Sequence, residues 1–368
     1  MRVALVHDWL INMGGAERVL EELARMFPDA PIYTGVVDRS RLSPYLRTRR
    51  IVPSLVQRWP LAIRWYNRYL PLLAYGFEQF DLSSYDLVIS SSAAVAKGVV
   101  TPAKTCHIAY VHTPMRYAWD LYHQYHTREA HGLTRKLMGP VFHYMRLWDR
   151  VSTDRVDVLV ANSTTVRARI KKHYRRPATV IHPPVAVDHF RVADQVADYY
   201  LVLSRLVSYK RFDLAIQAAN ALKRPLIVAG DGPERKHLER LAGPTVKFLG
   251  TVSDDQLGIL MSQARALIFP GEEDFGIAPV EAQAAGRPVI AYGRGGVMDT
   301  VQHAKTGVLF LEQTLEALVA AILEAETIAW DSQAIRQHAL QFGPERFRSQ
   351  FRDLVNQALA SHSLDPND

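Results

Sequence analysis

The sequence of 368 residues has very little cysteine and no long apolar run. Its one cysteine, Cys106, cannot form an internal disulfide and leaves no cysteine-based metal cluster, which is typical of proteins in a reducing compartment. The longest uncharged runs, such as residues 87–96 and 105–115, are well short of the roughly 18 residues that span a bilayer. The N-terminus passes from Arg2 into the short run 3–6 and lacks the longer apolar region of a signal peptide. These absences exclude a disulfide scaffold and an integral membrane protein, and we expect a cytoplasmic protein.

Motifs of nucleic-acid binding are also missing, although the net charge is positive. The 44 Lys and Arg residues exceed the 37 Asp and Glu residues, which gives a formal net charge of +7. Residues 1–190 contain 26 basic and 15 acidic residues, whereas residues 191–368 contain 18 and 22. Because no helix-turn-helix, zinc-finger or RNP-like pattern accompanies this basic first half, we do not expect a nucleic-acid partner.

Basic and aromatic residues are interleaved in the segment 47–69. Pro60 suits the first turn of a helix that runs toward Leu70. Arginines next to Trp and Tyr suit the headgroup layer of an anionic membrane, so this segment predicts a peripheral membrane contact. The alternative is a solvated helix whose aromatic side chains face the domain core. The interleaved residues are Arg47, Arg49, Arg50, Arg58, Trp59, Arg64, Trp65, Tyr66, Arg68 and Tyr69.

Short β-rich runs alternate with helical patterns along the whole chain. At about 150 residues per domain, the length predicts two domains. The alternation is typical of doubly wound parallel sheets, so we predict an α/β fold with one such sheet in each domain. The predicted strands are 2–7, 31–36, 86–91, 107–112 and 156–162, then 199–203, 225–229, 246–250, 266–270, 288–292 and 307–310, with helices such as 15–26 and 212–222 between them.

Two adjacent prolines, Pro183 and Pro184, favour an extended hinge between the halves. We therefore predict an N-terminal domain of residues 1–183 and a C-terminal domain of residues 184–343. Residues 344–360 have an amphipathic helical pattern, and we expect this helix to pack back on the first domain. Open α/β sheets bind ligands at the carboxyl ends of their strands, so two such domains facing each other are expected to form a ligand cleft.

Two glycines, Gly14 and Gly15, follow the first β-rich run and its extension through Asp8. Glycine allows the backbone to approach a ligand closely, and the helix that follows offers free N–H groups to an anion. The dinucleotide pattern G-x-G-x-x-G is absent. A tight turn from strand to helix with no ligand explains the glycines equally well.

Two cations, Arg205 and Lys210, follow the first strand of the second domain. At the carboxyl end of a strand, an Arg fork and a Lys point charge can converge on a diphosphate. Ordinary exposed cations are the alternative, and Arg211 beside them fits that description.

The most specific motif is the stretch 270–282, which follows a strand and leads into a helix. It contains Glu273 and Glu281, eight positions apart, and Gly276 between them. Two carboxylates that flank the N-terminus of a helix suit a ligand with both hydroxyls and phosphates. Acidic residues favoured by the helix dipole would explain one glutamate but not the whole pattern.

Together these motifs resemble the retaining glycosyltransferases of family 4, which have the GT-B fold of two Rossmann-like domains facing a cleft. The resemblance covers essentially the whole chain and is strongest in the second domain, where Glu273 and Glu281 match the E-x7-E motif of the family. It implies that Glu281 binds the ribose hydroxyls of a donor nucleotide and that Glu273 binds the hydroxyls of the donor sugar. It also implies a diphosphate clamp of Arg205 and Lys210.

The same resemblance implies roles for other residues. Gly15 would approach the phosphates from the first domain, and His112, at the end of a predicted strand, would contact the transferred sugar. The backbone of Phe275, Gly276, Ile277 and Ala278 would contact the sugar and phosphates, and the loops with Gly230, Gly250 and Val252 would surround the base.

Asp8, Arg116 and Asp120 are candidates for contacts with the acceptor, and helix capping and turn roles are the alternatives for them. The stretches 6–15 and 112–117 resemble the branch of the family that uses GDP-mannose to build O-antigen or exopolysaccharide. This resemblance implies a lipid-linked saccharide acceptor and an enzyme at the inner face of the plasma membrane. A UDP-sugar or a GDP-deoxysugar is the alternative donor.

The resemblance implies a retaining transfer in which the leaving diphosphate helps to deprotonate the acceptor, so no protein nucleophile is required. No D-x-D pair follows a predicted strand, and we therefore expect no metal and no cofactor. A nucleotide-sugar epimerase with two facing domains is the alternative enzyme. A periplasmic sugar-binding protein would need a signal peptide, and an NAD-dependent enzyme would need the missing glycine pattern.

Overall fold

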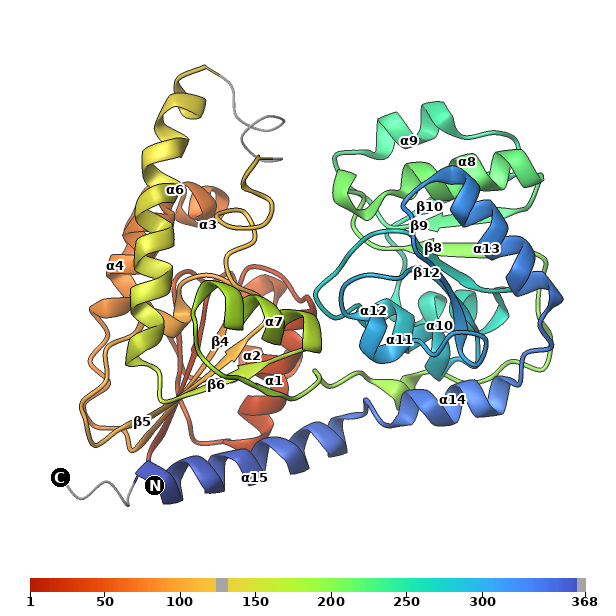
Figure 1. The fold of residues 1–368 in the computed structure, drawn as a ribbon. Coiled ribbons are helices and arrows are strands. Elements are labelled where there is room, and N and C mark those ends of the chain that lie inside the picture. The colour runs from red at the N-terminus through yellow and green to blue at the C-terminus, as the bar shows by residue number, and fades with distance from the viewer. Residues whose placement is uncertain (124–131, 363–368) are drawn as a thin grey trace. The chain divides into compact units, whose positions relative to one another are not determined.

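The computed structural model describes residues 1–123 and 132–362, which form two compact units (Figure 1). Unit 1 comprises Met1–Pro183 together with the chain from Phe347 onward, and unit 2 comprises Pro184–Arg346. The chain therefore changes unit once between the two adjacent prolines and returns to unit 1 within its last helix.

Unit 1 contains a parallel sheet of seven strands in the order β3-β2-β1-β4-β5-β6-β7. Successive residues of its central strands are apolar and point to opposite faces, so each strand contributes to two cores. Leu5 and Ile89 belong to one core, and Val6 and Val88 belong to the other. The strands are β1 Val3–His7, β2 Ile32–Thr34, β3 Ile51–Pro53, β4 Leu87–Ser92, β5 Cys106–Val111, β6 Val158–Ala161 and β7 Thr179–Val180.

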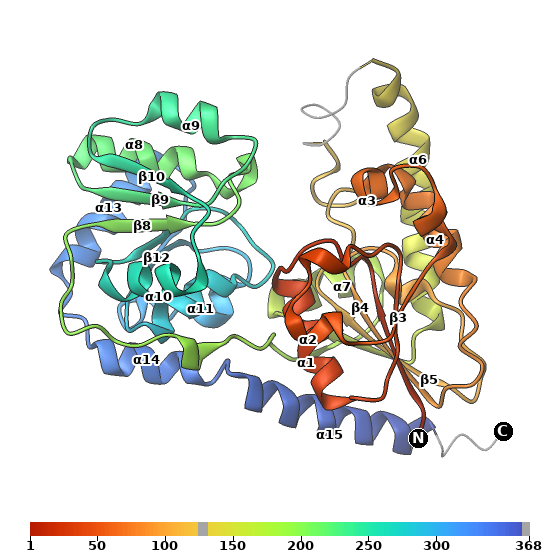
Figure 2. The ribbon, with the colours of Figure 1, turned by 180° about the vertical axis from the view of Figure 1, so that it is seen from behind.

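Helices cover both faces of this sheet. Residues of α1, α2 and α15 form the core of one face, and residues of α4 and α6 contribute to the core of the other; Figure 2 shows α1 and α15 from the side of the first core. The helices are α1 Gly15–Met26, α2 Pro44–Arg47, α3 Ala62–Trp65, α4 Leu70–Glu78, α6 Gly132–Ser152, α7 Thr164–His173 and α15 Pro344–His362, with 3₁₀ turns η1 Arg39–Arg41, η2 Leu55–Arg58, η3 Tyr66–Tyr69, η4 Ala96–Gly98 and η5 Thr153–Arg155.

The last helix, α15, packs on unit 1 through an aromatic stripe. Phe347 and Phe351 are fully buried and stack on each other with ring centroids 5.6 Å apart. Both rings also contact Tyr110 of β5. Arg348 on the same helix donates to both carboxylate oxygens of Glu22, at 2.7 and 2.9 Å.

Unit 2 contains a second parallel sheet, of six strands in the order β10-β9-β8-β11-β12-β13. Residues of α8, α9 and α13 pack on one face, and residues of α10, α11, α12 and α14 pack on the other. The elements are η6 Val187–His189, β8 Tyr200–Leu203, η7 Ser208–Lys210, α8 Phe212–Leu222, β9 Leu226–Ala229, α9 Arg235–Leu241, β10 Val246–Gly250, α10 Asp254–Gln263, β11 Leu267–Phe269, α11 Ile277–Ala284, β12 Val289–Tyr292, α12 Val297–Thr300, β13 Gly307–Phe310, α13 Leu315–Thr327 and α14 Ser332–Leu340.

The continuous helix predicted from Pro60 toward Leu70 is wrong. The segment breaks into η2, the four-residue α3, η3 and then α4. Leu61 lies between η2 and α3 in the left-handed region, with φ of 53°, which a right-handed helix cannot accommodate. None of the helices in the described ranges 1–123 and 132–362 is long and apolar enough to cross a membrane.

Candidate functional site

Each sheet has one point at which the strand order reverses, and the predicted site residues follow the strands at these points. In unit 1 the chain runs outward from β1 through β2 to β3 and then returns to the other side of β1 as β4. In unit 2 the same reversal separates β8 from β11. Loops that leave neighbouring strands in opposite directions open a crevice at such a point, and ligands of open α/β sheets bind there.

An ion pair joins the loops after β8 and β11 in unit 2. Lys210 Nζ lies 2.7 Å from Glu273 Oε1, and the same ammonium donates to the hydroxyl of Ser204. The two charged side chains are 13% and 23% exposed, respectively. Glu273 and Lys210, to which the family resemblance gives contacts with the donor sugar and the diphosphate, therefore lie together at the reversal point.

Close backbone packing holds these two loops in place. A Cβ atom on Gly271 would lie only 2.7 Å from the Cα atom of Lys210, so only glycine fits there. On the other side, the Gly296 N–H donates to the Glu273 carbonyl at 2.8 Å, which ties this loop to the loop after β12. The position of the ion pair is thus fixed by the backbone.

The helix α11 begins immediately after this loop. Gly276 precedes the helix with φ of 84°, and Ile277 and Ala278 form its first turn. The Phe275 ring is buried and lies 6.0 Å from the Phe342 ring. Glu281 lies one turn into α11 and is only 5% exposed. The N-terminus of α11 and the Glu281 carboxylate therefore follow Glu273 closely along the chain.

The loops predicted to surround a base also lie close together. The Gly230 N–H donates to the Gly250 carbonyl at 2.7 Å, and the Leu206 N–H donates to the Asp231 carbonyl at 3.0 Å. Val252 lines a cavity of about 390 Å³, together with Leu249 and Thr251 and with residues of α10. Arg205, between β8 and Lys210, is exposed.

In unit 1, Asp8 is a buried carboxylate that organises a loop. It follows β1, is 3% exposed, and accepts backbone N–H bonds from four successive residues, 93–96, at 2.6–3.0 Å. These bonds support the turn role that the sequence left open for Asp8, because they use both of its oxygens.

Asp120 also has structural partners. Arg169 Nε lies 2.8 Å from one carboxylate oxygen and His173 Nε2 lies 3.1 Å from the other, and these contacts lower the pKa of Asp120, that of His173 most strongly. The His173 ring stacks on Trp119 at 4.5 Å. Arg116, four residues earlier, accepts through its carbonyl a 2.7 Å hydrogen bond from the Leu121 N–H, which closes this turn.

His112 directly follows β5 and contacts Ser91 of β4, one of the two strands at the reversal point. Its Nε2 lies 2.8 Å from Ser91 Oγ, and the same oxygen lies 3.2 Å from His7 Nδ1. Burial, with the nearby His7 as a smaller cause, lowers the pKa of His112 to about 3. Gly15 opens α1 beside this group, and its neighbour Gly14 donates to Glu17 Oε2 at 2.9 Å.

Comparison with known families identifies the chain. The sequence model of Glycosyltransferase Family 4 matches residues 13–189, and that of Glycosyl transferases group 1 matches residues 190–341. The chain belongs to glycosyltransferase family 4.

Curated relatives of this glycosyltransferase act on several substrates. It is 30% identical over 247 residues to D-inositol 3-phosphate glycosyltransferase of Streptomyces avermitilis, an alignment that covers 56% of this chain and 53% of that one. It is 30% identical over 203 residues to a GDP-mannose-dependent alpha-(1-6)-phosphatidylinositol monomannoside mannosyltransferase of Mycobacterium tuberculosis, with 46% of this chain and 53% of that one covered. The chain thus spans about half the length of the curated relatives that it matches.

Solved structures confirm the GT-B fold of the glycosyltransferase. Sucrose-phosphate synthase from Thermosynechococcus elongatus matches with a TM-score of 0.73 at 17% identity, over 98% of this chain and 100% of that one. HepE from Anabaena, in complex with UDP-glucose, matches with a TM-score of 0.70 at 18% identity, over 97% and 100% of the two chains. At these identities the likeness concerns the fold alone.

Several buried polar residues of the glycosyltransferase were missed by sequence reasoning. His7 and Ser91 lie opposite each other in the register of β1 and β4, and the uncharged run that contains Ser91 gave only a strand signal. Lys97 and Asp149 form a buried ion pair, to which Trp119 Nε1 also donates at 2.7 Å. A charged residue in an apolar stretch is the only trace of this pair in the sequence.

One group of side chains in unit 1 has the residue types of a metal site. Ligand atoms of Cys106, Asp157 and His362 lie within 4.8 Å of one another. Burial and the Asp157 charge raise the pKa of Cys106 to about 12, so its sulfur is a neutral thiol, whereas a metal ligand must be a thiolate. Asp157 already accepts from the His107 N–H at 2.6 Å. We assign no metal to this group.

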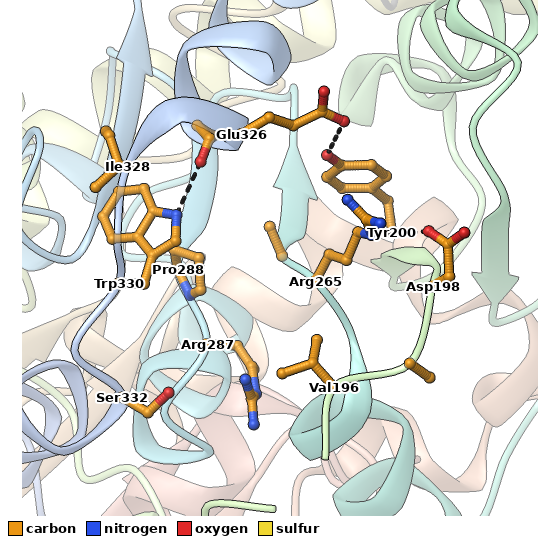
Figure 3. A pocket seen from close by; sticks show the side chains of 13 residues that line it. Val196, Asp198, Tyr200, Arg265, Arg287, Pro288, Glu326, Ile328, Trp330 and Ser332 are labelled. Carbon is orange, nitrogen blue, oxygen red and sulfur yellow. Dashed lines mark hydrogen bonds and ion pairs between the residues drawn. The ribbon is translucent and has the colours of Figure 1, made fainter. Parts of the chain in front are cut away.

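A pocket of about 390 Å³ lies at the opposite, amino-terminal edge of the sheet in unit 2 (Figure 3). Its charges are already satisfied within the glycosyltransferase. Arg265 pairs with Asp198 at 2.7 Å, and Glu326 accepts from Tyr200 at 2.9 Å and pairs with Arg224. We therefore do not assign the donor to this pocket.

Proposed function

We propose that this glycosyltransferase transfers a mannosyl group from GDP-mannose to a lipid-linked saccharide, with retention of the anomeric configuration and without a metal. The observation that carries the proposal is the Lys210–Glu273 ion pair at the reversal point of unit 2, followed directly by α11 and Glu281. The mannosyltransferase relative, which is named as GDP-mannose-dependent, favours this donor over a UDP-sugar or a GDP-deoxysugar.

In unit 2 we assign the donor contacts residue by residue. Glu281 binds the ribose hydroxyls, and Glu273 binds the hydroxyls of the sugar. Arg205 and Lys210 bind the diphosphate, together with the backbone of Phe275, Gly276, Ile277 and Ala278. The loops of Gly230, Gly250 and Val252 hold the base, and the cavity beside Val252 gives them an apolar surface. Its volume is within the range of small-molecule sites.

In unit 1 we assign His112 to the transferred sugar and Gly15 to the phosphates. A neutral His112 suits this role because it can form a hydrogen bond without placing a positive charge beside an oxocarbenium-like transition state. The acceptor lies near the same edge, and Arg116 is the candidate that we retain for it. The structural bonds of Asp8 and Asp120 make both of them organisers of their loops.

The reaction needs stabilisation of the charge that develops on the leaving diphosphate. Lys210 supplies a fixed cation for it, because its ammonium is held by both Ser204 and Glu273. Preorganised charges of this kind lower the barrier without reorganisation during the reaction. The leaving diphosphate then accepts the proton of the acceptor hydroxyl, so neither a protein nucleophile nor a metal is required.

We further propose that the segment 55–69 contacts an anionic membrane at the inner face of the plasma membrane. Trp59 and Leu61 are 43% and 53% exposed, and Arg58, Arg64 and Arg68 are exposed beside them. Aromatic and aliphatic side chains that lie among arginines suit the headgroup layer. Arg47 and Arg49 are less suited, because both bond to backbone carbonyls of their own unit.

The donor assignment is tested by thermal shift with GDP-mannose, UDP-glucose and ADP-glucose. We expect GDP-mannose to raise the melting temperature most, and we expect Glu281→Ala to abolish that shift. A larger shift with UDP-glucose would reassign the donor, and no shift with any nucleotide sugar would contradict the proposal.

The membrane contact is tested by sedimentation with anionic phospholipid vesicles. Replacement of Arg58, Arg64 and Arg68 by Glu should abolish binding. The matched control replaces the exposed residues Lys171, Lys172 and Arg175 by Glu, which changes the net charge equally at the C-terminal end of α7, outside the segment 55–69. If both variants lose binding equally, binding depends on net charge alone, and a specific membrane-contacting surface is refuted.

A further inference from the structure

A chain of polar side chains runs from α1 to His112 in unit 1. Glu17 Oε1 lies 3.8 Å from His7 Nε2, His7 Nδ1 lies 3.2 Å from Ser91 Oγ, and Ser91 Oγ lies 2.8 Å from His112 Nε2. His7, Glu17 and Ser91 are only 2%, 6% and 0% exposed. Burial of polar groups costs folding free energy unless they find partners. These three residues come from β1, α1 and β4, and the series of contacts between them ends at the ring of His112.

The contacts of Ser91 allow two patterns of donation. Ser91 has one hydroxyl hydrogen but contacts two ring nitrogens, so it can donate to one of them and must accept from the other. The 2.8 Å contact with His112 Nε2 is typical of an O–H donor, and the 3.2 Å contact with His7 Nδ1 is within the range of an N–H donor. These lengths suit a pattern in which Ser91 donates to His112 and accepts from His7, and the reverse pattern would place the proton of His112 on Nε2.

In the pattern in which Ser91 donates to His112, the ring of His112 has a single tautomer. Its Nε2 accepts and so carries no proton, and because burial lowers the pKa of His112 to about 3, the ring is neutral at physiological pH. The single proton of the ring is then on Nδ1. Nδ1 has no hydrogen-bond partner within residues 1–123 and 138–362. The edge of the Tyr110 ring, 5.2 Å away between centroids, holds the imidazole from the side.

We propose that Ser91 is a positioning residue: it accepts from Nδ1 of His7, donates to Nε2 of His112 and so fixes His112 as the Nδ1–H tautomer, whose N–H donates to a hydroxyl of the transferred sugar. The inference rests on the proposed function, because it takes the sugar as the partner of His112. Ser91 does not touch the substrate and acts only through the ring that it orients.

The same strand provides a matched control. Ser90, the preceding residue of β4, points to the other face of the sheet, where its Oγ lies 2.9 Å from His107 Nε2. Both residues are fully buried. Ser90→Ala thus removes a buried serine–histidine hydrogen bond of the same kind, in the same strand, without touching His112.

The experiment combines ¹⁵N NMR of the histidine ring nitrogens with turnover of Ser91→Ala, Ser91→Thr and Ser90→Ala. We expect wild-type His112 to be protonated on Nδ1 and Ser91→Ala to lose this preference, with kcat reduced about tenfold, as expected for one hydrogen bond, at unchanged KM for the acceptor. Ser91→Thr retains the hydroxyl and should restore both the tautomer and kcat. Ser90→Ala should leave both unchanged.

Three results would overturn the inference: a wild-type His112 protonated on Nε2, an unchanged kcat in Ser91→Ala, or an equal loss in Ser90→Ala. Failure of the proposed function is distinct, because the wild type would then transfer no sugar from any donor. In that case the NMR spectra alone decide whether Ser91 fixes the tautomer.

Discussion

Lys210→Ala separates the catalytic from the structural role of the ion pair in unit 2. Loss of the ammonium leaves Glu273, whose side chain is 23% exposed, without its cation. A hydrogen bond to a charged group contributes about 1.5–3 kcal/mol, so the variant should still fold. If Lys210 stabilises the leaving diphosphate, loss of one preorganised charge should lower kcat by about 10²–10³, or roughly 2.7–4 kcal/mol in the barrier.

The assay compares kcat at a temperature at which both proteins are folded, with stability followed by thermal unfolding. Arg211→Ala is the control, because the neighbouring Arg211 pairs with Asp213 at 3.1 Å and has no predicted contact with the donor. It should alter stability slightly and leave kcat unchanged. A Lys210→Ala enzyme within about threefold of wild-type kcat, a difference of under 1 kcal/mol, would refute the role of Lys210.

Three further predictions concern stability, pH and metals. Lys97→Met and Asp149→Asn should each destabilise unit 1 by about 3–5 kcal/mol in guanidinium unfolding, and the double variant should cost less than the sum of the two, because each single change leaves a buried charge or its partner unpaired; additive costs would contradict the pairing. Burial lowers the pKa of both His107 and His112 from 6.5 to about 3, so between these pH values the unfolded chain binds more protons than the folded chain, and the free energy of unfolding should fall as the pH drops from 6.5 toward 3. A free energy of unfolding that does not change with pH, in the wild type and in His107→Gln alike, would contradict this. EDTA should leave the rate of sugar transfer unchanged, and loss of activity that Mg²⁺ restores would overturn the metal-free mechanism.

The sequence predicts the regular parts of the fold because they depend on local patterns. The alternation of β-rich runs and helical periodicity predicts the central strands of both sheets, and Pro183 with Pro184 marks the change of unit. The strands β3 and β7, with three and two residues, are too short to show a period. The left-handed Leu61, which breaks the predicted helix, has no signature because leucine rarely adopts this conformation.

The site residues that lie in one loop can be predicted from the sequence. The residues that are brought together only by the order of the strands cannot. Glu273 and Glu281 are eight positions apart and can be identified from spacing. The contacts of Ser91 with His112 and His7 require β4 to lie between β5 and β1, and no local pattern contains this order. Asp8 is similar, because its four N–H partners lie about 85 positions further along the chain.

The most direct test of the account is transfer of radiolabelled mannose from GDP-mannose, with bacterial lipid extract as the acceptor and a Glu273→Ala variant beside the wild type. We expect the wild-type enzyme to incorporate label into the organic-solvent fraction in the presence of EDTA, in an α-linkage that matches the donor, and we expect no incorporation by the Glu273→Ala variant. Incorporation by both proteins, or a β-linked product, would contradict it.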